Sequence, residues 1–179
     1  MVGAERRRGR DLIVEVNISG RSAGDPDLLE LIERELADAE VRPGQIIFEI
    51  SETIAVSNIP RAQHFAARLA DLGCRFALDD FGAGFGSFSY LKHLPFDYLK
   101  IDGDFVRHSA VDTTDQLVIQ AVVDIAHGLG KRTIAEHVGD QATTALLRSM
   151  GVDHAQGFHL GGPAPLSDWL PEAEAAVLA

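Results

Sequence analysis

Amphipathic helices alternate with short β-prone runs along this chain, and one pattern occurs three times. A helix ends at a glycine, an apolar run follows, and a polar residue stands where the strand should end. Gly73, Gly130 and Gly151 are the three glycines, each suited to the left-handed position after a helix. The helices are predicted at 60–72, 113–129 and 141–150, and the strands at 74–78, 132–135 and 152–155.

The same alternation extends to the rest of the chain. Further strands are predicted at 12–16, 45–48 and 97–99, with a helix at 26–39. Six strands that alternate with helices indicate an α/β fold with a parallel sheet rather than a sandwich or a helical bundle. A closed barrel and an open doubly wound sheet both fit this pattern, and both place function at the carboxyl ends of the strands.

Polar side chains stand where these six strands end. They are Asn17, Glu49, Asp79 with Asp80, Lys100 with Asp102, Glu136 and Gln156. A parallel sheet gathers them at one rim, where clustered carboxylates raise one another's pKa values unless a cation neutralises them. Oxygen ligands without histidine or cysteine at zinc-like spacing favour Mg²⁺ or Mn²⁺. Two adjacent aspartates suit a pair of metal ions, an arrangement that supports in-line attack at phosphorus.

Each of these residues also has a structural interpretation. A single aspartate at a strand end most often caps a helix or forms a turn. Polar residues at six strand ends in succession are less easily a coincidence, and the run from Asp79 to Gly84 is the most specific local signal. Its glycines alone are weak evidence for a loop that binds phosphate.

Composition narrows the class of protein. The 179 residues are 46% hydrophobic and 24% charged, which fits a globular domain. The net charge of -11 disfavours polymeric nucleic acid as a partner. Cys74 is the single cysteine, and no apolar run is long enough to cross a bilayer, so we expect a soluble, cytoplasmic protein without membrane contact from this segment. Four arginines mark residues 1–10 as a basic, solvated end, and 11–179 as the domain.

Six motifs resemble those of the EAL-domain family of bacterial cyclic di-GMP phosphodiesterases. They are Val16-Asn17-Ile18-Ser19, Phe48-Glu49-Ile50-Ser51-Glu52, the run from Asp79 to Gly84, Leu99-Lys100-Ile101-Asp102, Ala135-Glu136-His137-Val138-Gly139 and Gln156-Gly157-Phe158. The resemblance runs in order through most of the chain. It departs from the family at Ala83, Gly86, His137 and Gly139, and His137 is expected to crowd the rim.

The resemblance implies a (β/α)8 TIM-barrel-like fold and hydrolysis of cyclic di-GMP to the linear dinucleotide by two metal ions, Mg²⁺ or Mn²⁺. The residues that it implies as metal ligands are Asn17, Glu49, Asp79, Asp80 and Glu136. The residues implied in catalysis are Lys100, which would orient water and offset phosphate charge, with Glu136, Gln156 and Asp80. Asp102, Gly82 and Gly84 are expected to contact the substrate.

The name-giving Glu-Ala-Leu strand of the family has no counterpart in this sequence. A barrel of this kind takes about 250 residues, so roughly 70 are absent from the front, and the chain is either a fragment or a shortened protein. We expect an incomplete barrel of about six strands, weaker metal binding, and association into a homodimer or larger oligomer that covers the open edges. A non-catalytic module that binds cyclic di-GMP or a protein stays open as the alternative. A metal-dependent aldolase-like barrel is disfavoured by the ordered motifs.

Overall fold

Six parallel strands form a single curled sheet in this computed structural model, which describes residues 12–39, 41–84, 88–165 and 168. The strands are β1 (Val14–Asn17), β2 (Ile46–Ser51), β3 (Arg75–Phe81), β4 (Tyr98–Ile101), β5 (Arg132–Ala135) and β6 (His154–Ala155). They neighbour one another in chain order, and every pair is parallel. The basic segment at 1–10 and Gly86 lie outside the described residues.

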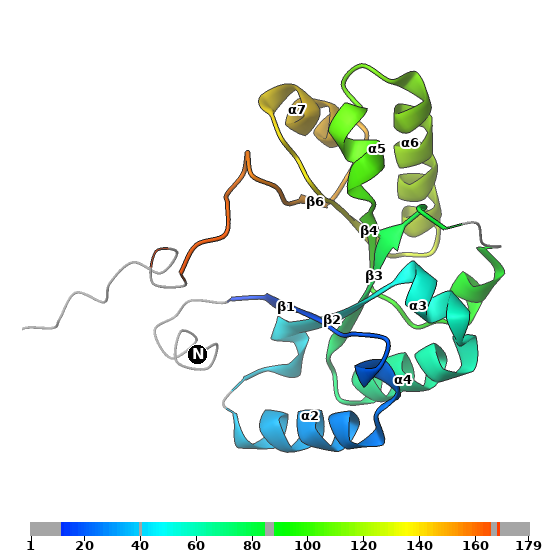
Figure 1. The fold of residues 1–179 in the computed structure, drawn as a ribbon, viewed down its shortest axis with the longest axis vertical. Helices are drawn as coiled ribbons and strands as arrows, with labels where there is room; N and C mark the ends of the chain where they lie inside the picture. The colour runs from blue at the N-terminus through cyan, green and yellow to red at the C-terminus, as the bar shows by residue number, and fades with distance from the viewer. Residues whose placement is uncertain (1–11, 40, 85–87, 166–167, 169–179) are drawn as a thin grey trace, which may run out of the picture.

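In the part of the chain that is described, the α-helices lie on the outer side of this sheet (Figure 1). They are α2 (Pro26–Asp38), α3 (Glu52–Ser57), α4 (Ile59–Asp71), α5 (Gly103–His108), α6 (Thr113–Gly128) and α7 (Gln141–Ser149). Aspartates at the N-caps of α2, α6 and α7 accept backbone N–H groups of the first turn, which fixes where each helix begins. None of the helices described is long and apolar enough to cross a membrane.

Two helices differ from the sequence prediction. The segment before the helix expected at 60–72 is itself helical, as α3, and Asn58 separates it from α4 by accepting the N–H of Arg61 at 3.2 Å. Helix α5 was not predicted at all. Both unpredicted helices have six residues, too few for an apolar periodicity to show.

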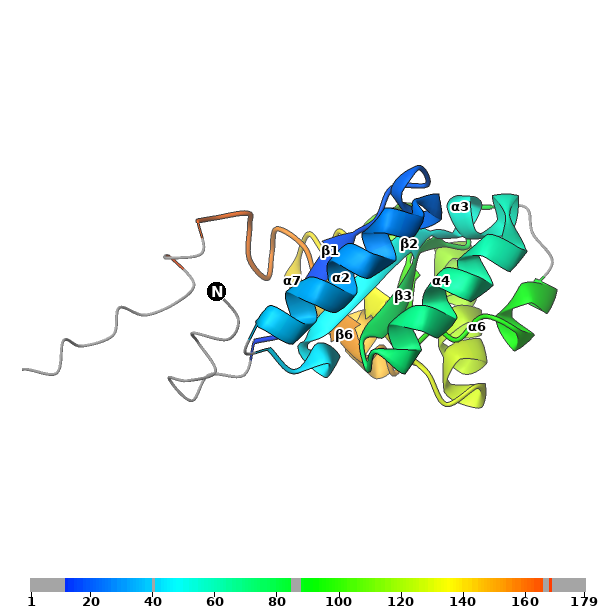
Figure 2. The same cartoon turned by 90° about the horizontal axis from the view of Figure 1, so that it is seen from below.

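The hydrophobic core lies in two layers because neighbouring residues of a strand face opposite sides of the sheet. Residues such as Phe76, Leu78 and Leu99 face outward and pack in the larger cluster with the helices. A smaller buried cluster, Ile47, Ala77, Tyr98 and Ile134, faces inward. Figure 2 shows α2 and α4 running beside each other along the outer side, where Arg68 of α4 pairs with Glu33 of α2.

The inner side of the sheet stays open. A cavity of about 400 Å³ is lined by inward residues that include Glu15, Tyr98 and His154. Because the helices cover one side only and the sheet curls around this cavity, the architecture is a half-barrel rather than an open doubly wound sheet. This confirms the expectation of an incomplete barrel with six strands.

Candidate active site

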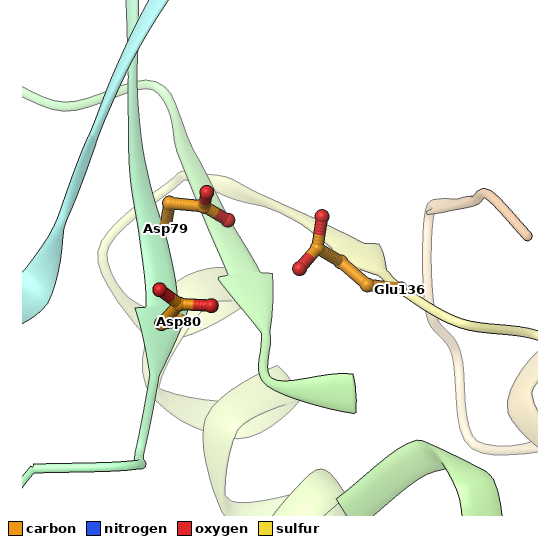
Figure 3. Close-up of side chains that lie close together, drawn as sticks. All are labelled: Asp79, Asp80 and Glu136. Atoms are coloured by element: carbon orange, nitrogen blue, oxygen red, sulfur yellow. The ribbon is translucent and has the colours of Figure 1, made fainter. Parts of the chain in front are cut away.

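A bulge in β3 brings two consecutive carboxylates to the same side of the sheet. The register with β4 shifts between Leu78 and Phe81, and Asp80 has a left-handed backbone with φ of 52°. In a regular strand Asp79 and Asp80 would face opposite sides, whereas the bulge turns Asp80 toward the rim. Figure 3 shows both side chains projecting toward Glu136 at the end of β5. One oxygen of each of these three carboxylates lies within 4.8 Å of the others.

Lys100 stands at the centre of the carboxylate cluster. Its Nζ lies 2.7 Å from Glu49 Oε2, 3.0 Å from Asp79 Oδ1 and 2.8 Å from Glu136 Oε1. The lysine side chain is only 3% exposed, so solvent screens these charges little. Lys100 is therefore the counter-ion of acidic residues from three other strand ends.

Gln156 connects the last strand to the cluster. Its backbone N–H donates to the carbonyl of Ala135 at 2.8 Å, and its side-chain Nε2 donates to Glu136 Oε1 at 2.6 Å. The carboxylate of Glu136 thus accepts from both an ammonium and an amide, which holds its orientation.

Burial and like charges act on the pKa values of the site. Burial, then Asp79 and Glu15, raise the pKa of Glu49, and Lys100 offsets part of this rise. The pKa of Asp80 is raised by burial and then by Asp79, Asp102 and Glu136. Burial alone would lower the pKa of Lys100, but its contacts with Glu136 and Glu49 raise it overall. The rim therefore carries a net negative charge, and the lysine inside it is protonated.

The remaining predicted residues lie around this cluster in different ways. Asn17 is exposed and pairs in register with Glu49. Asp102 Oδ1 accepts the N–H of Asp104 at 2.7 Å, so it caps α5. Gly82 has φ of +100° and gives its N–H to Glu52, whereas Gly84 is exposed.

Glu52 received no role in the sequence analysis, yet it fixes the loop after β3. Its Oε2 accepts the N–H of Gly82 at 3.0 Å, and its Oε1 accepts the hydroxyl of Tyr90 at 2.6 Å. The carboxylate is buried although it stands in the first turn of α3, where a solvated residue is the usual interpretation. Only its place in the quoted motif, three residues after Glu49, pointed to it.

The chemistry of the donors fits a divalent metal ion. Glu49 Oε2 and Asp79 Oδ1 are buried and lie 2.7 and 3.0 Å from the Lys100 ammonium, with no other hydrogen-bond donor on them among the described residues. Each carboxylate oxygen has a further lone pair that can bind a cation. An all-oxygen set of carboxylates suits Mg²⁺ or Mn²⁺. Among the described residues, Asp79, Asp80 and Glu136 form a group of carboxylates close enough to hold one ion.

Relatives of known sequence align with this chain over most of its length. Cyclic di-GMP phosphodiesterase PdeB of Shewanella oneidensis is 37% identical over 165 residues, which is 92% of this chain and 19% of that protein. Cyclic di-GMP phosphodiesterase PdeF of Escherichia coli is 33% identical over 159 residues, 89% of this chain and 21% of that protein. The chain therefore spans about a fifth of the length of these relatives.

Solved structures share the fold. PaMucR phosphodiesterase in a c-di-GMP complex superposes with a TM-score of 0.89 at 30% identity, covering 94% of this chain and 68% of that one. Klebsiella pneumoniae BlrP1 in a manganese and cy-diGMP complex gives a TM-score of 0.79 at 28% identity, covering 88% of this chain and 40% of that one. A family model described as EAL domain matches residues 2–163. The half-barrel is thus part of a known architecture, and this chain belongs to the EAL domain family.

Proposed function

We propose that this chain hydrolyses one phosphodiester bond of cyclic di-GMP and releases the linear dinucleotide. The observation that carries the proposal is the convergence of Asp79, Asp80 and Glu136 within 4.8 Å around a buried lysine. Relatives named as cyclic di-GMP phosphodiesterases and a solved c-di-GMP complex support this choice of substrate.

The residues divide into a metal-holding set and a positioning set. Those that would hold Mg²⁺ or Mn²⁺ are Asn17, Glu49, Asp79, Asp80 and Glu136. When bound, two such ions would activate water and neutralise charge on the phosphodiester. Gln156 keeps Glu136 in place through its 2.6 Å hydrogen bond, and Glu52 fixes the loop that follows Asp80.

Lys100 contributes positive charge to the reacting phosphate. Water adds to phosphorus, the bond from phosphorus to the 3′ oxygen breaks, and the leaving oxygen takes up a proton. Negative charge increases on the phosphoryl oxygens in this step, and a fixed ammonium in a buried site stabilises it. Since the pKa of Lys100 is raised, it keeps its proton and acts by charge rather than as a base.

The test is a hydrolysis assay on the purified chain with cyclic di-GMP and Mn²⁺, in which the nucleotides are separated by chromatography. We expect linear dinucleotide to accumulate, and excess chelator to stop it. Asp79→Asn should abolish most of the activity, because an amide lacks the charge of the carboxylate. Asp25→Asn, at the exposed N-cap of α2, is the matched control. Product formation that persists in chelator, or a wild-type rate in Asp79→Asn, contradicts the proposal.

A second candidate is a module that binds cyclic di-GMP without cleaving it. The position of Lys100 favours it, because the ammonium lies within 3.0 Å of three carboxylates and offsets part of their charge without a metal. Calorimetry with cyclic di-GMP separates the two functions. Saturable binding with no product in the presence of Mn²⁺ supports the module and rejects the enzyme.

We also infer that the chain associates with a second copy. β1 and β6 are the ends of the sheet, and neither pairs with another strand in the part of the chain that is described. Unpaired strand edges promote association. Light scattering on the purified chain should give at least twice the monomer mass, and a monomer at all concentrations would reject the inference.

A further inference from the structure

Basic residues gather at the end of the barrel opposite the carboxylate rim. Arg75, Tyr98 and Arg132 are the first residues of β3, β4 and β5. Tyr98 and Arg132 are Cα partners in the ladder, and Arg75 Nη1 donates to the hydroxyl of Tyr98 at 2.8 Å. Arg75 therefore contacts the phenol directly, and Arg132 stands next to Tyr98 in the ladder, at the amino ends of adjacent strands.

These residues line a pocket of about 220 Å³, which we call the floor pocket. Its lining residues are Arg75, Asp97, Tyr98, Gly130, Lys131 and Arg132. Lys131 Nζ lies 5.5 Å from the centre of the Phe96 ring, a cation–π contact that holds a third positive charge beside the pocket. In a chain with a net charge of -11, three clustered cations are a local exception.

None of these three cations forms an ion pair within the described residues. Some arginines elsewhere do form ion pairs, such as Arg34 with Glu35 at 3.4 Å. Asp97 also lines the floor pocket, but its Oδ2 accepts the N–H of Phe76 at 2.9 Å, so it is part of the strand connection. Three cations and one carboxylate leave the pocket with a net charge of +2.

We propose that the floor pocket binds a phosphate dianion, either free or as the terminal phosphate of a small metabolite. A dianion matches the net charge of the pocket, and planar guanidinium groups bind phosphate oxygens through paired N–H donors. The hydroxyl of Tyr98, held by Arg75, orients that guanidinium toward the pocket. The floor pocket is separate from the rim. Arg75, Tyr98 and Arg132 stand at the amino ends of β3, β4 and β5, whereas the rim residues stand at the carboxyl ends of these strands.

Nuclear magnetic resonance of the ¹⁵N-labelled chain tests the proposal. Inorganic phosphate and guanosine 5′-monophosphate are titrated separately, at constant ionic strength and with chelator present. Without metal ions the acidic rim repels both probes, so the signal reports the floor pocket. We expect saturable shifts of the Gly130, Lys131 and Arg132 amides. Similar affinity for both probes indicates free phosphate as the ligand, and tighter binding of the nucleotide indicates a phosphorylated metabolite.

Variants assign the binding to the guanidinium groups. Arg132→Gln should weaken phosphate binding about tenfold, and Arg75→Gln with Arg132→Gln should weaken it further. Arg132 is exposed and has no side-chain partner to lose among the described residues, so the single variant stays informative if the double variant does not fold. Arg34→Gln, on the outer side of α2, should bind as the wild type does. The absence of saturable shifts, or equal affinity in Arg132→Gln, overturns the proposal.

Discussion

Replacing Lys100 by methionine tests whether the rim needs its internal counter-ion. Methionine keeps most of the length of the side chain but removes the charge. Glu49, Asp79 and Glu136 then face one another without the ammonium that lies 2.7 to 3.0 Å from each of them. The lysine and Glu49 are both 3% exposed, so water cannot replace the lost contact.

The expected loss of stability is large. Removing one partner of a buried ion pair costs about 3–5 kcal/mol. In a domain of this size each kcal/mol lowers Tm by about 2–4 °C, so Tm should fall by about 6–20 °C. Burial raises the pKa of Glu49, and the variant lacks the lysine that offsets this rise, so the deficit should become smaller as the pH falls from 8 and this carboxyl takes up a proton.

Thermal melts followed by circular dichroism measure this, in chelator and again with Mn²⁺. The metal ion supplies the missing positive charge and should recover most of the lost Tm. Lys92→Met, at an exposed lysine, is the matched control and should melt as the wild type does. A variant that keeps the wild-type Tm in chelator at pH 8 would show that Lys100 does not hold the carboxylates together.

Three further predictions concern contacts around the site and the outer side of the sheet. Gln156→Leu should lower kcat by about tenfold with a smaller change in KM, because Glu136 loses one of its two hydrogen-bond donors. Steady-state kinetics measure this change, and an unchanged kcat contradicts the prediction. Tyr90→Phe should lower the free energy of unfolding in urea by about 1.5–3 kcal/mol, since it leaves a buried oxygen of Glu52 without a donor; an unchanged midpoint contradicts it. Burial raises the pKa of Asp153, but hydrogen bonds from His127 and Thr133 lower it overall. This carboxylate therefore stabilises the fold above about pH 4 and loses that effect as pH falls further. In urea titrations Asp153→Asn should be less stable than wild type at pH 7, and the difference should shrink as the pH falls below about 4.

The order of the strands could be predicted because it depends on local signals. Gly73, Gly130 and Gly151 have φ of +80°, +69° and +84°, as expected of residues that end a helix. No local signal of this kind predicts the curl of the sheet. It depends on the inward packing of residues such as Tyr98 and Ile134, which are distant in sequence. The last strand was predicted at 152–155 but keeps only His154–Ala155, as is common at the edge of a sheet.

The rim residues were predictable for the same reason, since each follows an apolar run. Their detailed geometry was not. The bulge that turns Asp80 toward Glu136 depends on how β3 pairs with β4, and no single residue in the sequence predicts it. The burial of Glu52 depends on Tyr90, 38 positions later in the chain. Contacts over such distances cannot be derived from the periodicity of one segment.

The arrangement of the sheet in chain order also affects how the protein folds. Because each strand pairs with the one before it, each pairing of the sheet closes one crossover between consecutive βα units rather than a loop across the whole domain. During synthesis the amino-terminal strands emerge first and can pair before the rest of the chain exists. Gln156, which holds Glu136, is the last of the rim residues to leave the ribosome. We therefore expect the half-barrel to assemble progressively and its carboxylate rim to be completed only when synthesis of this segment ends.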